Sequence, residues 1–457
     1  MNKILLFTFC LCSLFIASCA ERFLDEKSEK SLVIFTKLTE FESLMDRLSV
    51  MNQMTSQELA ILSLDDYYLL PTDWQLLASS IQRNAYVWNS EIFEGEWSRD
   101  WNNGYERIFY ANIALEGLAK MTPAEKEEKL WGEVKGRALF HRAWNHYSIM
   151  LLFGEYTGSL EVDGTGVPLR RESDINIPVT RSTLKDTYQF ILSDLQESLR
   201  VIGDDVYNPE RPSKCAVLML LSKIYLYQQD YVRAWEYAQQ ALAVNNKLID
   251  FNTLDVTPVQ VFPIYGAGNP EIVFNAWLPA LPALAQTRAC MDESLYELYD
   301  DNDLRKQAYF MRNPQNGRLN FKGSYVGYAL PFSGLSINEL YLIAMEAACR
   351  IGRQEESLNL YNRLRSHRFS AESYTPVQNV GREELLTMIL EEKRRELVMR
   401  ASRWEDLKRL NRSGEWSYEL SRDINGQRYV LPPNDKRYIF PIPQYVIDKS
   451  NIEQNPR

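Results

Sequence analysis

The stretch from Cys215 to Val244 reads CAVLMLLSKIYLYQQDYVRAWEYAQQALAV and carries two amphipathic helical patterns in succession. Apolar residues recur in each half at spacings of three and four, which is typical of one face of an α-helix. These residues are Leu218, Leu221 and Tyr225 in the first half and Ala234, Ala238 and Ala241 in the second. The residues from Gln228 to Asp230 separate the halves, so the stretch predicts a helical hairpin.

The residues expected where the two helices meet are small: Ser222, Ala234 and Ala241. Small side chains let two helix axes approach closely, so shape as well as polarity specifies the hairpin. The order of leucine, small residue, tyrosine and two alanines resembles a tetratricopeptide repeat. One such hairpin cannot bury its apolar faces alone, and neighbouring hairpins are therefore expected.

Helical periodicity recurs on both sides of this stretch and predicts hairpins at about residues 101–153, 183–244 and 336–410. Gly154 stands where a left-handed helix cap is expected, and Gly352 stands where the third hairpin turns. The predicted fold class is mainly α, with a tetratricopeptide-like scaffold of helical hairpins and an irregular, loop-rich lobe that binds a ligand.

The irregular lobe is expected at about residues 245–334, where the helical pattern stops. This segment holds seven of the 19 prolines, short apolar runs and isolated aromatic residues. Irregular segments of this length inside a compact chain usually form a functional lobe. Charged residues crowd the helical stretch further on, where Glu391 and Arg395 are four apart. That spacing suits a surface ion pair, and a solvated helix face is expected there.

The first residues, MNKILLFTFCLCSLFIASC, predict a secretory signal. The apolar run from Ile4 to Ala17 is too short to span a bilayer comfortably. Ile16 to Cys19 resembles a bacterial lipobox, in which cleavage makes Cys19 the first residue and its sulfur carries a lipid. The alternative is an ordinary signal peptide with an incidental cysteine. Two or more acyl chains would anchor the mature protein durably to a membrane.

The predicted domain organisation is a cleaved signal over residues 1–18, a polar tether over 19–30 and a single domain over 31–457. Removing the signal takes away Lys3 alone, so the mature charge is 50 − 61 = −11. This charge argues against nucleic acid as a partner. Three cysteines remain, without the spacing of a disulfide framework or a zinc site, and are expected to be buried: Cys215, Cys290 and Cys349.

Patterns for catalysis are missing. The sequence has no Gly-x-Ser-x-Gly motif and no phosphate-binding loop. His141 and His146 are five apart on one predicted helix and therefore on different faces, which argues against zinc catalysis. Glycoside hydrolysis needs two carboxyl groups that face each other across a cleft. The acidic pairs Asp65-Asp66 and Asp300-Asp301 are adjacent in sequence, and no pattern indicates such an arrangement for them. No enzymatic activity, cofactor or metal site is predicted.

Several segments, in order, resemble the SusD/RagB family of surface lipoproteins from the Bacteroidetes. The resemblance spans essentially the whole mature chain, and one departure is Arg400-Ala401 where the family commonly has Glu-Gly. The matching segments are Trp101 to Leu118, Gly132 to Gly154, Asn338 to Arg365, Glu392 to Arg409, Pro441-Ile442-Pro443 and Gln454-Asn455-Pro456.

The resemblance implies a non-catalytic nutrient-binding lipoprotein on the outer face of the outer membrane. Such a protein would cover a SusC-like TonB-dependent transporter and deliver oligosaccharides to it. In some relatives the ligand is a peptide. The ligand's identity is not implied by these residues.

A sugar-binding surface would combine exposed aromatic rings with a few polar groups, because sugar rings have flat apolar faces and hydroxyl edges. The candidates come from the aromatic span before residue 101 and from the irregular lobe. The aromatic candidates are Tyr67, Tyr68, Trp74, Trp277 and Tyr296, and the polar candidates are Asp66 and Asn275. Core packing is the alternative for each.

The rival hypothesis is a repeat scaffold that binds another protein, because tetratricopeptide hairpins commonly hold peptides in a concave face. A scaffold would bury its aromatic residues, whereas a glycan binder would expose several of them on one shallow surface.

Overall fold

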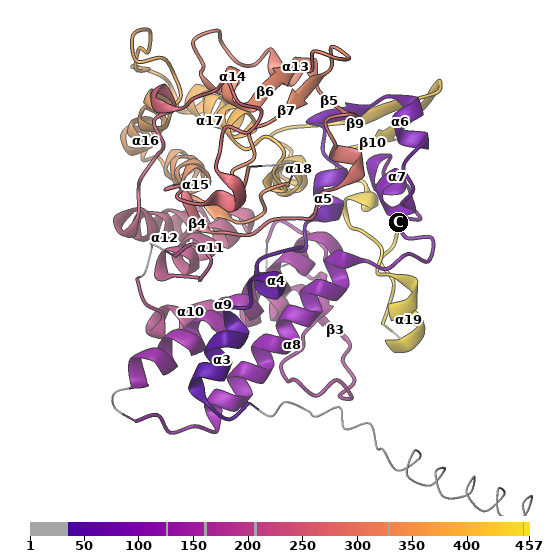
Figure 1. Cartoon of the computed structure of the whole chain (residues 1–457), viewed down its shortest axis with the longest axis vertical. Helices are drawn as coiled ribbons and strands as arrows, with labels where there is room; N and C mark the ends of the chain where they lie inside the picture. Colours follow the sequence, from indigo (N-terminus) through magenta and orange to yellow (C-terminus); the bar gives the residue numbers. More distant parts are fainter. Residues whose placement is uncertain (1–34, 125–126, 160–161, 205–207, 328–329, 451) are drawn as a thin grey trace, which may run out of the picture.

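A computed structural model describes residues 35–124, 127–159, 162–204, 208–327, 330–450 and 452–457 (Figure 1). The predicted signal, the tether and the lipidated Cys19 lie outside the described residues. Within the described ranges, no helix is long and apolar enough to cross a membrane.

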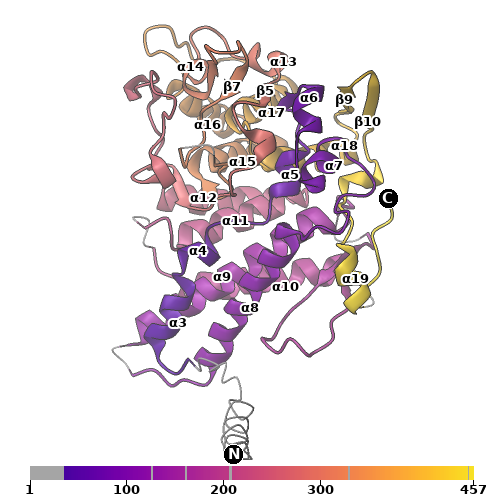
Figure 2. The same ribbon diagram turned by 45° about the vertical axis from the view of Figure 1, so that its right-hand side comes forward.

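Long helices form the scaffold, and the prediction of a mainly α, hairpin-based fold is confirmed. Figures 1 and 2 show α8, α9 and α10 at one end, followed by α11, α12 and α15. Consecutive helices pack against each other from α8 through α12, and α12 packs against α15 and α15 against α16 and α17. The helices are α8 (Arg99–Ala119), α9 (Glu128–Phe153), α10 (Leu184–Val201), α11 (Lys214–Tyr227), α12 (Tyr231–Val244), α15 (Ile337–Arg350), α16 (Gln354–Ser366), α17 (Arg382–Glu396) and α18 (Ser402–Ser413).

Short elements surround this scaffold. The N-terminal helices are α3 (Leu38–Met45), α4 (Leu48–Met51), α5 (Glu58–Leu62), α6 (Pro71–Gln75) and α7 (Ser80–Tyr86), and the last helix is α19 (Gln444–Ser450). The segment 245–334 contains α13 (Glu293–Tyr296), α14 (Arg305–Tyr309) and the strands β4 (Ile272–Phe274), β5 (Ala289–Met291), β6 (Phe310–Arg312) and β7 (Leu319–Phe321). The remaining strands are β1 (Tyr67–Leu69), β2 (Thr165–Pro168), β3 (Arg181–Thr183), β8 (Leu335–Ser336), β9 (Leu420–Ile424) and β10 (Gln427–Leu431).

The strands form antiparallel pairs rather than one sheet. β1 pairs with β5, β2 with β3, β4 with β8, β6 with β7, and β9 with β10. Two of these pairs, β1 with β5 and β4 with β8, join segments that are far apart in the sequence. They fasten the irregular lobe to the N-terminal region and to the start of α15.

The hairpin of α11 and α12 packs as its small residues predict. Ser222, Ala234 and Ala241 are fully buried. Gly352 turns the third hairpin with a φ of +83°, a conformation that favours glycine. Gly154, however, has φ −100° and ψ 158°, so the predicted left-handed cap is wrong. A Cβ on Gly154 would lie 2.2 Å from the sulfur of Met150, and close approach is the reason for glycine there.

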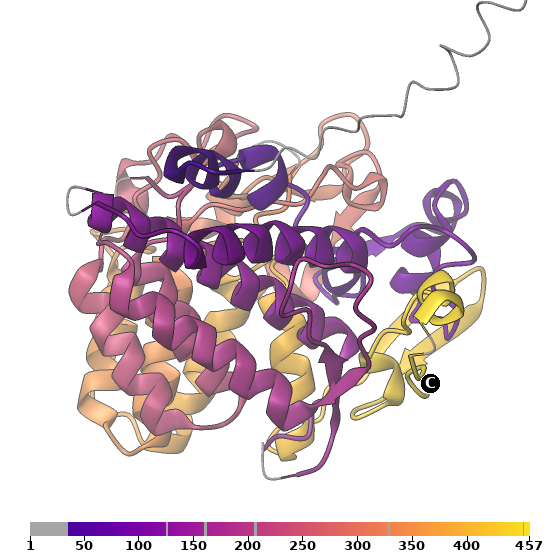
Figure 3. The same cartoon turned by 90° about the horizontal axis from the view of Figure 1, so that it is seen from below.

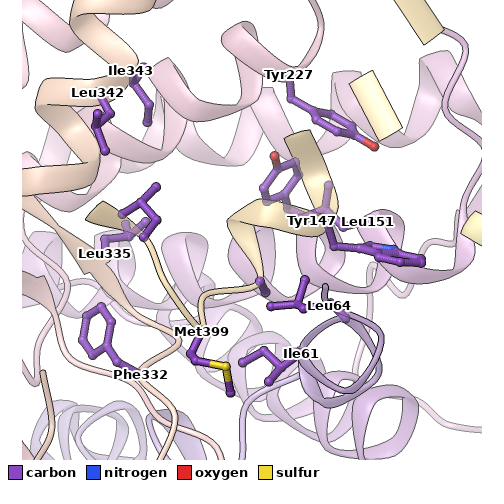
Figure 4. Packing of buried hydrophobic residues seen from close by; sticks show 14 of the residues in the cluster. Ile61, Leu64, Tyr147, Leu151, Tyr227, Phe332, Leu335, Leu342, Ile343 and Met399 are labelled. Atoms are coloured by element: carbon purple, nitrogen blue, oxygen red, sulfur yellow. The ribbon is translucent and has the colours of Figure 1, made fainter. Parts of the chain in front are cut away.

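One continuous apolar core joins the scaffold to the irregular lobe. Figure 4 shows Tyr147 of α9, Tyr227 of α11 and Leu342 of α15 with Phe332 and Met399 in the same packed region. All five side chains are buried. Because the core crosses from helices to loops, the lobe is held in a fixed place on the scaffold.

Four charged residues in the C-terminal half of α17 are buried, so the predicted solvated face is wrong for that half, although the predicted pair of Glu391 and Arg395 is present. Glu392, Lys393, Arg395 and Glu396 are all buried, while Glu391 remains half exposed and lies 3.8 Å from Arg395. The physical reason is pairing: each buried charge on this helix has an oppositely charged partner within hydrogen-bond distance.

Two fully buried arginines connect this helix to the irregular lobe. Arg305 lies 2.6 Å from Asp303, 2.6 Å from Glu392 and 2.7 Å from Glu396. Burial by itself would raise the pKa of the Glu392 carboxyl, but the guanidinium groups of Arg305, Arg395 and Arg365 bring it well below its usual range.

The second of these arginines, Arg368, shares Glu396 with Arg305 and adds one further carboxylate, Glu271. It lies 2.7 Å from Glu271 and 2.8 Å from Glu396. Glu271 also accepts a hydrogen bond from the hydroxyl of Tyr325, at 2.5 Å. We call Glu271, Asp303, Arg305, Arg368, Glu392 and Glu396 the buried charge network.

Asp65 and Asp66 are structural carboxylates with different partners. Asp65 lies 2.7 Å from Arg394 and 2.9 Å from Arg403. Asp66 is buried and accepts a hydrogen bond from the backbone N–H of Met399, at 2.8 Å. Burial raises the pKa of Asp66 to about 6, with nearby Asp65 acting in the same direction and Arg394 against it.

Replacing Arg305 by leucine should destabilise the fold strongly, by about 3–5 kcal/mol, because three carboxylates lose a buried cation. Urea denaturation measures this change. The matched control is Arg353→Leu, because Arg353 and Glu356 form an exposed pair. Exposed pairs contribute about 0–1 kcal/mol. Equal losses in the two variants would contradict the role given to the buried charge network.

Replacing Asp66 by asparagine should remove a loss of folding stability that depends on pH. The folded pKa of about 6 lies above the ordinary 3.8, so the folded state binds the proton more tightly. The contribution of Asp66 to the free energy of unfolding therefore falls as pH rises from about 4 to about 6. Asparagine keeps an acceptor for Met399 and has no such dependence.

The variant should therefore gain up to about 3 kcal/mol relative to the unaltered chain between about pH 4 and pH 7. Urea denaturation at both pH values measures the difference. A difference that stays constant with pH would show that Asp66 does not titrate in this window.

Candidate functional site

Four of the seven predicted site residues are buried. They are Asp66, Tyr67, Asn275 and Trp277. Tyr67 donates its hydroxyl proton to the carbonyl of Leu62 at 2.9 Å, inside the core. The predicted platform is therefore not assembled as one exposed surface, and these four side chains offer little surface to a ligand in this structure.

Tyr67 and Tyr68 differ because they are neighbours on a strand. Successive side chains of β1 point to opposite sides, so Tyr67 enters the core while Tyr68 is 37% exposed. Tyr68 pairs with Cys290 on β5, which leads directly into α13. Partial burial, followed by the neighbouring Cys290, raises the pKa of the Tyr68 hydroxyl.

The same face of the irregular lobe carries Tyr296. Its ring centre lies 5.9 Å from the guanidinium carbon of Arg312, and Arg312 forms a 3.0 Å ion pair with Glu293 of α13. Tyr68 and Glu293 are close enough for their charges to interact. The structure thus brings Tyr68 and Tyr296 to one side of α13, joined by Glu293 and Arg312.

Tyr296 lies in an open cavity of about 340 Å³, which we call the upper cleft. The ring packs edge-on against Phe310, with centres 5.4 Å apart, and the ammonium group of Lys306 lies 5.2 Å from its centre. The cleft is lined by Val256, Thr257, Tyr296, Lys306, Gln307, Phe310, Met311, Arg312, Leu319 and Lys322. It lies among α13, α14 and the β6–β7 hairpin, at the top of Figure 1.

The edge of the upper cleft is held in place by Lys322. Its ammonium group donates to the carbonyls of Val256 and Pro258, at 2.6 and 3.2 Å. Desolvation lowers the pKa of this lysine. The result is a preformed site that presents one aromatic ring beside several N–H donors, which suits a ligand with an apolar face and polar edges.

Trp74 is half-buried on α6, outside the lining of the upper cleft. Its indole N–H donates to the carbonyl of Arg83 at 3.0 Å. The preceding residue, Asp73, lies 2.8 Å from Arg318, which follows β6 in the lobe. Trp74 is thus attached to the same region but presents only part of its surface.

Trp277 supports an exposed aromatic residue that the sequence did not single out. The ring of Tyr265 lies 5.3 Å from that of Trp277 and is 53% exposed. Asn275 donates to the carbonyl of Tyr265 at 2.7 Å, and Tyr265 has a left-handed φ of 54°. In the sequence, Tyr265 directly precedes Gly266-Ala267-Gly268, a pattern typical of a turn. Because turns lie at the surface, this pattern could have predicted that Tyr265 is exposed.

Two of the three histidines and the three cysteines of the described residues are withdrawn from solvent. His141 and His146 are buried, and burial lowers the pKa of each to about 3, so both are neutral near pH 7. The three cysteines in the described part of the chain are free and buried. No group of three or more His, Cys, Asp or Glu residues that could hold a metal ion occurs in that part either.

A larger cavity than the upper cleft lies elsewhere in the described part of the chain. It measures about 600 Å³ and is formed by α8, the segment 169–180 and α19. No predicted site residue lines it, because the candidates came from the aromatic span before residue 101 and from the irregular lobe.

Two family models match the chain, one at each end. A model described as "starch-binding associating with outer membrane" matches residues 22–226, and a model of the SusD family matches residues 337–457. The region between them, 227–336, includes the whole irregular lobe and with it the residues of the upper cleft.

Similar proteins cover most of the chain. SusD-like protein P2 of Formosa agariphila is 23% identical and covers 78% of this chain and 79% of that protein. SusD-like protein P38 of the same organism is 22% identical and covers 78% of each.

Solved structures share the fold. A putative sugar-binding protein from Bacteroides vulgatus has a TM-score of 0.74 at 22% identity, covering 93% of this chain and 99% of that one. Surface glycan-binding protein A from Bacteroides fluxus has a TM-score of 0.68 at 17% identity, covering 92% and 98%. These structures share the fold, and the two SusD family models, which together match more than half of the chain, show that the chain belongs to the SusD/RagB family.

Proposed function

We propose that this protein binds oligosaccharides at the upper cleft and does not change them chemically. The observation that carries the proposal is Tyr296, an aromatic ring in an open cleft with Lys306 and Arg312 within 6 Å of its centre. A sugar ring can lie against Tyr296 while its hydroxyl groups accept from the neighbouring N–H donors.

The family supports this ligand class. One matching model is described as starch-binding, and similar structures carry the descriptions sugar-binding and glycan-binding. The acidic candidates support binding without hydrolysis. Asp66 is buried against Met399, and Asp65 is paired with two arginines, so this pair does not face a sugar across the cleft.

The proposed place of action is the outer face of the outer membrane. The lipobox-like Ile16 to Cys19 and the model description "associating with outer membrane" support a lipid anchor there. The protein would pass captured oligosaccharides to a SusC-like TonB-dependent transporter, as the family resemblance implies. Tyr68, on the same face as the cleft, would extend the sugar-binding surface beyond Tyr296.

Replacing Tyr296 by alanine should weaken oligosaccharide binding roughly tenfold, because a lost aromatic contact of about 1.5 kcal/mol corresponds to that factor. Retention of the purified protein in gels that contain starch, xylan, laminarin or alginate measures the effect. The matched control is Tyr429→Ala, because Tyr429 is also partly buried but lies on β10, away from the cleft.

The control should be retained like the unaltered chain. Equal retention of Tyr296→Ala and the unaltered chain would place the sugar elsewhere. Saturable binding of peptides, with no retention on any glycan, would replace the oligosaccharide with a peptide ligand.

A further inference from the structure

A second groove lies along α8, remote from the upper cleft in the sequence. Trp101, Tyr105 and Phe109 line it from one helix face, since they are four residues apart. At 1.5 Å per residue, successive rings are displaced by about 6 Å along the helix axis. The rings of Trp101 and Tyr105 are in contact, with centres 5.0 Å apart. We call the cavity beside this aromatic row the lower groove.

The opposite wall of the lower groove is the segment 169–180, which links β2 to β3 and which we call the arm. Figure 3 shows this segment beside α8, with the yellow C-terminal part of the chain next to it. The amide of Asn112, on α8, donates to the carbonyls of Arg170 and Glu172, both at 3.1 Å. Glu116 accepts from the backbone N–H and the hydroxyl of Ser173, at 2.5 and 2.6 Å.

The arm is also braced across its own width. The guanidinium group of Arg170 donates to the carbonyl of Ile177 at 2.6 Å. These bonds fix the arm at α8 while its apolar side chains stay accessible: Ile175 is 74% exposed and Ile177 is 39% exposed. Both side chains line the lower groove and therefore add accessible apolar surface to its wall.

The third wall is α19, which contributes Val446, Lys449 and Ser450. Tyr445 fixes this helix to the start of α8, because its hydroxyl accepts from Asn102 and from the backbone N–H of Ser98. Three separate segments therefore enclose about 600 Å³, a volume within the range of about 300–1,000 Å³ that is usual for ligand sites.

The chemistry of the lower groove fits a sugar chain. Tyr105 and Phe109 are partly exposed and offer flat apolar faces, with the buried Trp101 packed against Tyr105. Glu172, Asn176 and Lys449 provide polar groups among the lining residues. A peptide that added to the arm as a strand would need free backbone groups. Four backbone groups of the arm already bond to side chains: the carbonyls of Arg170, Glu172 and Ile177 and the N–H of Ser173.

We propose that the lower groove is a second carbohydrate-binding site, which takes a linear oligosaccharide along Tyr105 and Phe109, with Trp101 at one end of the row. It shares its ligand class with the proposed function, and it uses none of the residues of the upper cleft. Two sites on one chain would let the protein hold a long glycan at two points, which raises the apparent affinity for long chains above that for short ones.

Phe109→Ala tests the lower groove, and Tyr110→Ala is its matched control. Phe109 lines the groove, whereas Tyr110 is the next residue on α8 and packs against the cluster of α3. Binding of the purified full chain to linear oligosaccharides prepared from starch, xylan and laminarin is measured by isothermal titration. Ile177→Ser, on the arm, provides a second variant whose exposed position leaves the core intact.

The unaltered chain should bind two equivalents of oligosaccharide. Phe109→Ala and Ile177→Ser should each weaken one of the two binding events about fivefold or more, by loss of an apolar contact. Tyr110→Ala should leave both unchanged, and Tyr296→Ala should weaken only the other event.

Each contrary outcome points to one of the two sites. A single binding event that is lost in Tyr296→Ala and unchanged in Phe109→Ala and Ile177→Ser overturns the lower groove and leaves the proposed function standing. A single event lost in Phe109→Ala and unchanged in Tyr296→Ala supports the lower groove and removes the upper cleft. No binding of any oligosaccharide overturns both.

Discussion

The structure depends on two arginines that have no contact with solvent. Arg305 and Arg368 are surrounded by four carboxylates, of which Glu392 and Glu396 belong to the scaffold and Glu271 and Asp303 to the irregular lobe. A charge in the protein interior is tolerated only with its partner. The lobe therefore cannot move away from α17 without exposing or orphaning several charges at once. This constraint turns a segment rich in loops into a fixed part of the protein.

The upper cleft benefits directly from this constraint. Arg305 opens α14, and β6 follows that helix at once, so the anchor lies within a few residues of Phe310 and Arg312. On the other side, Tyr299 donates its hydroxyl to the carbonyl of Arg395 on α17 at 2.5 Å, three residues after Tyr296. An oligosaccharide bound at the proposed site would meet groups that are already in place, and little conformational entropy would be lost on binding.

The helical scaffold could be predicted because apolar residues recur with the period of an α-helix, 3.6 residues, in stretches such as Cys215 to Val244. The buried charge network could not, because its members lie at 271, 303, 305, 368, 392 and 396 and acquire meaning only when the chain folds. Of the seven candidate site residues, Tyr296 lines the upper cleft and Tyr68 is partly exposed, whereas four are buried. Successive side chains of a strand point to opposite faces, so the sequence alone could have predicted that only one of Tyr67 and Tyr68 is exposed. The exposure of Tyr265 and the burial of Trp277 depend on contacts between distant loops, which no local pattern records.

The position of the upper cleft relative to the start of the described chain has a mechanical consequence. Phe35, the first described residue, packs near α3, while α13 and α14 lie at the opposite end of the longest axis (Figures 1 and 2). For a body held near its N-terminal side, the displacement produced by tilting grows with distance from the pivot. If the proposed lipid holds the protein there, the upper cleft would sweep a wider arc than α3 and α8, which lie near the pivot.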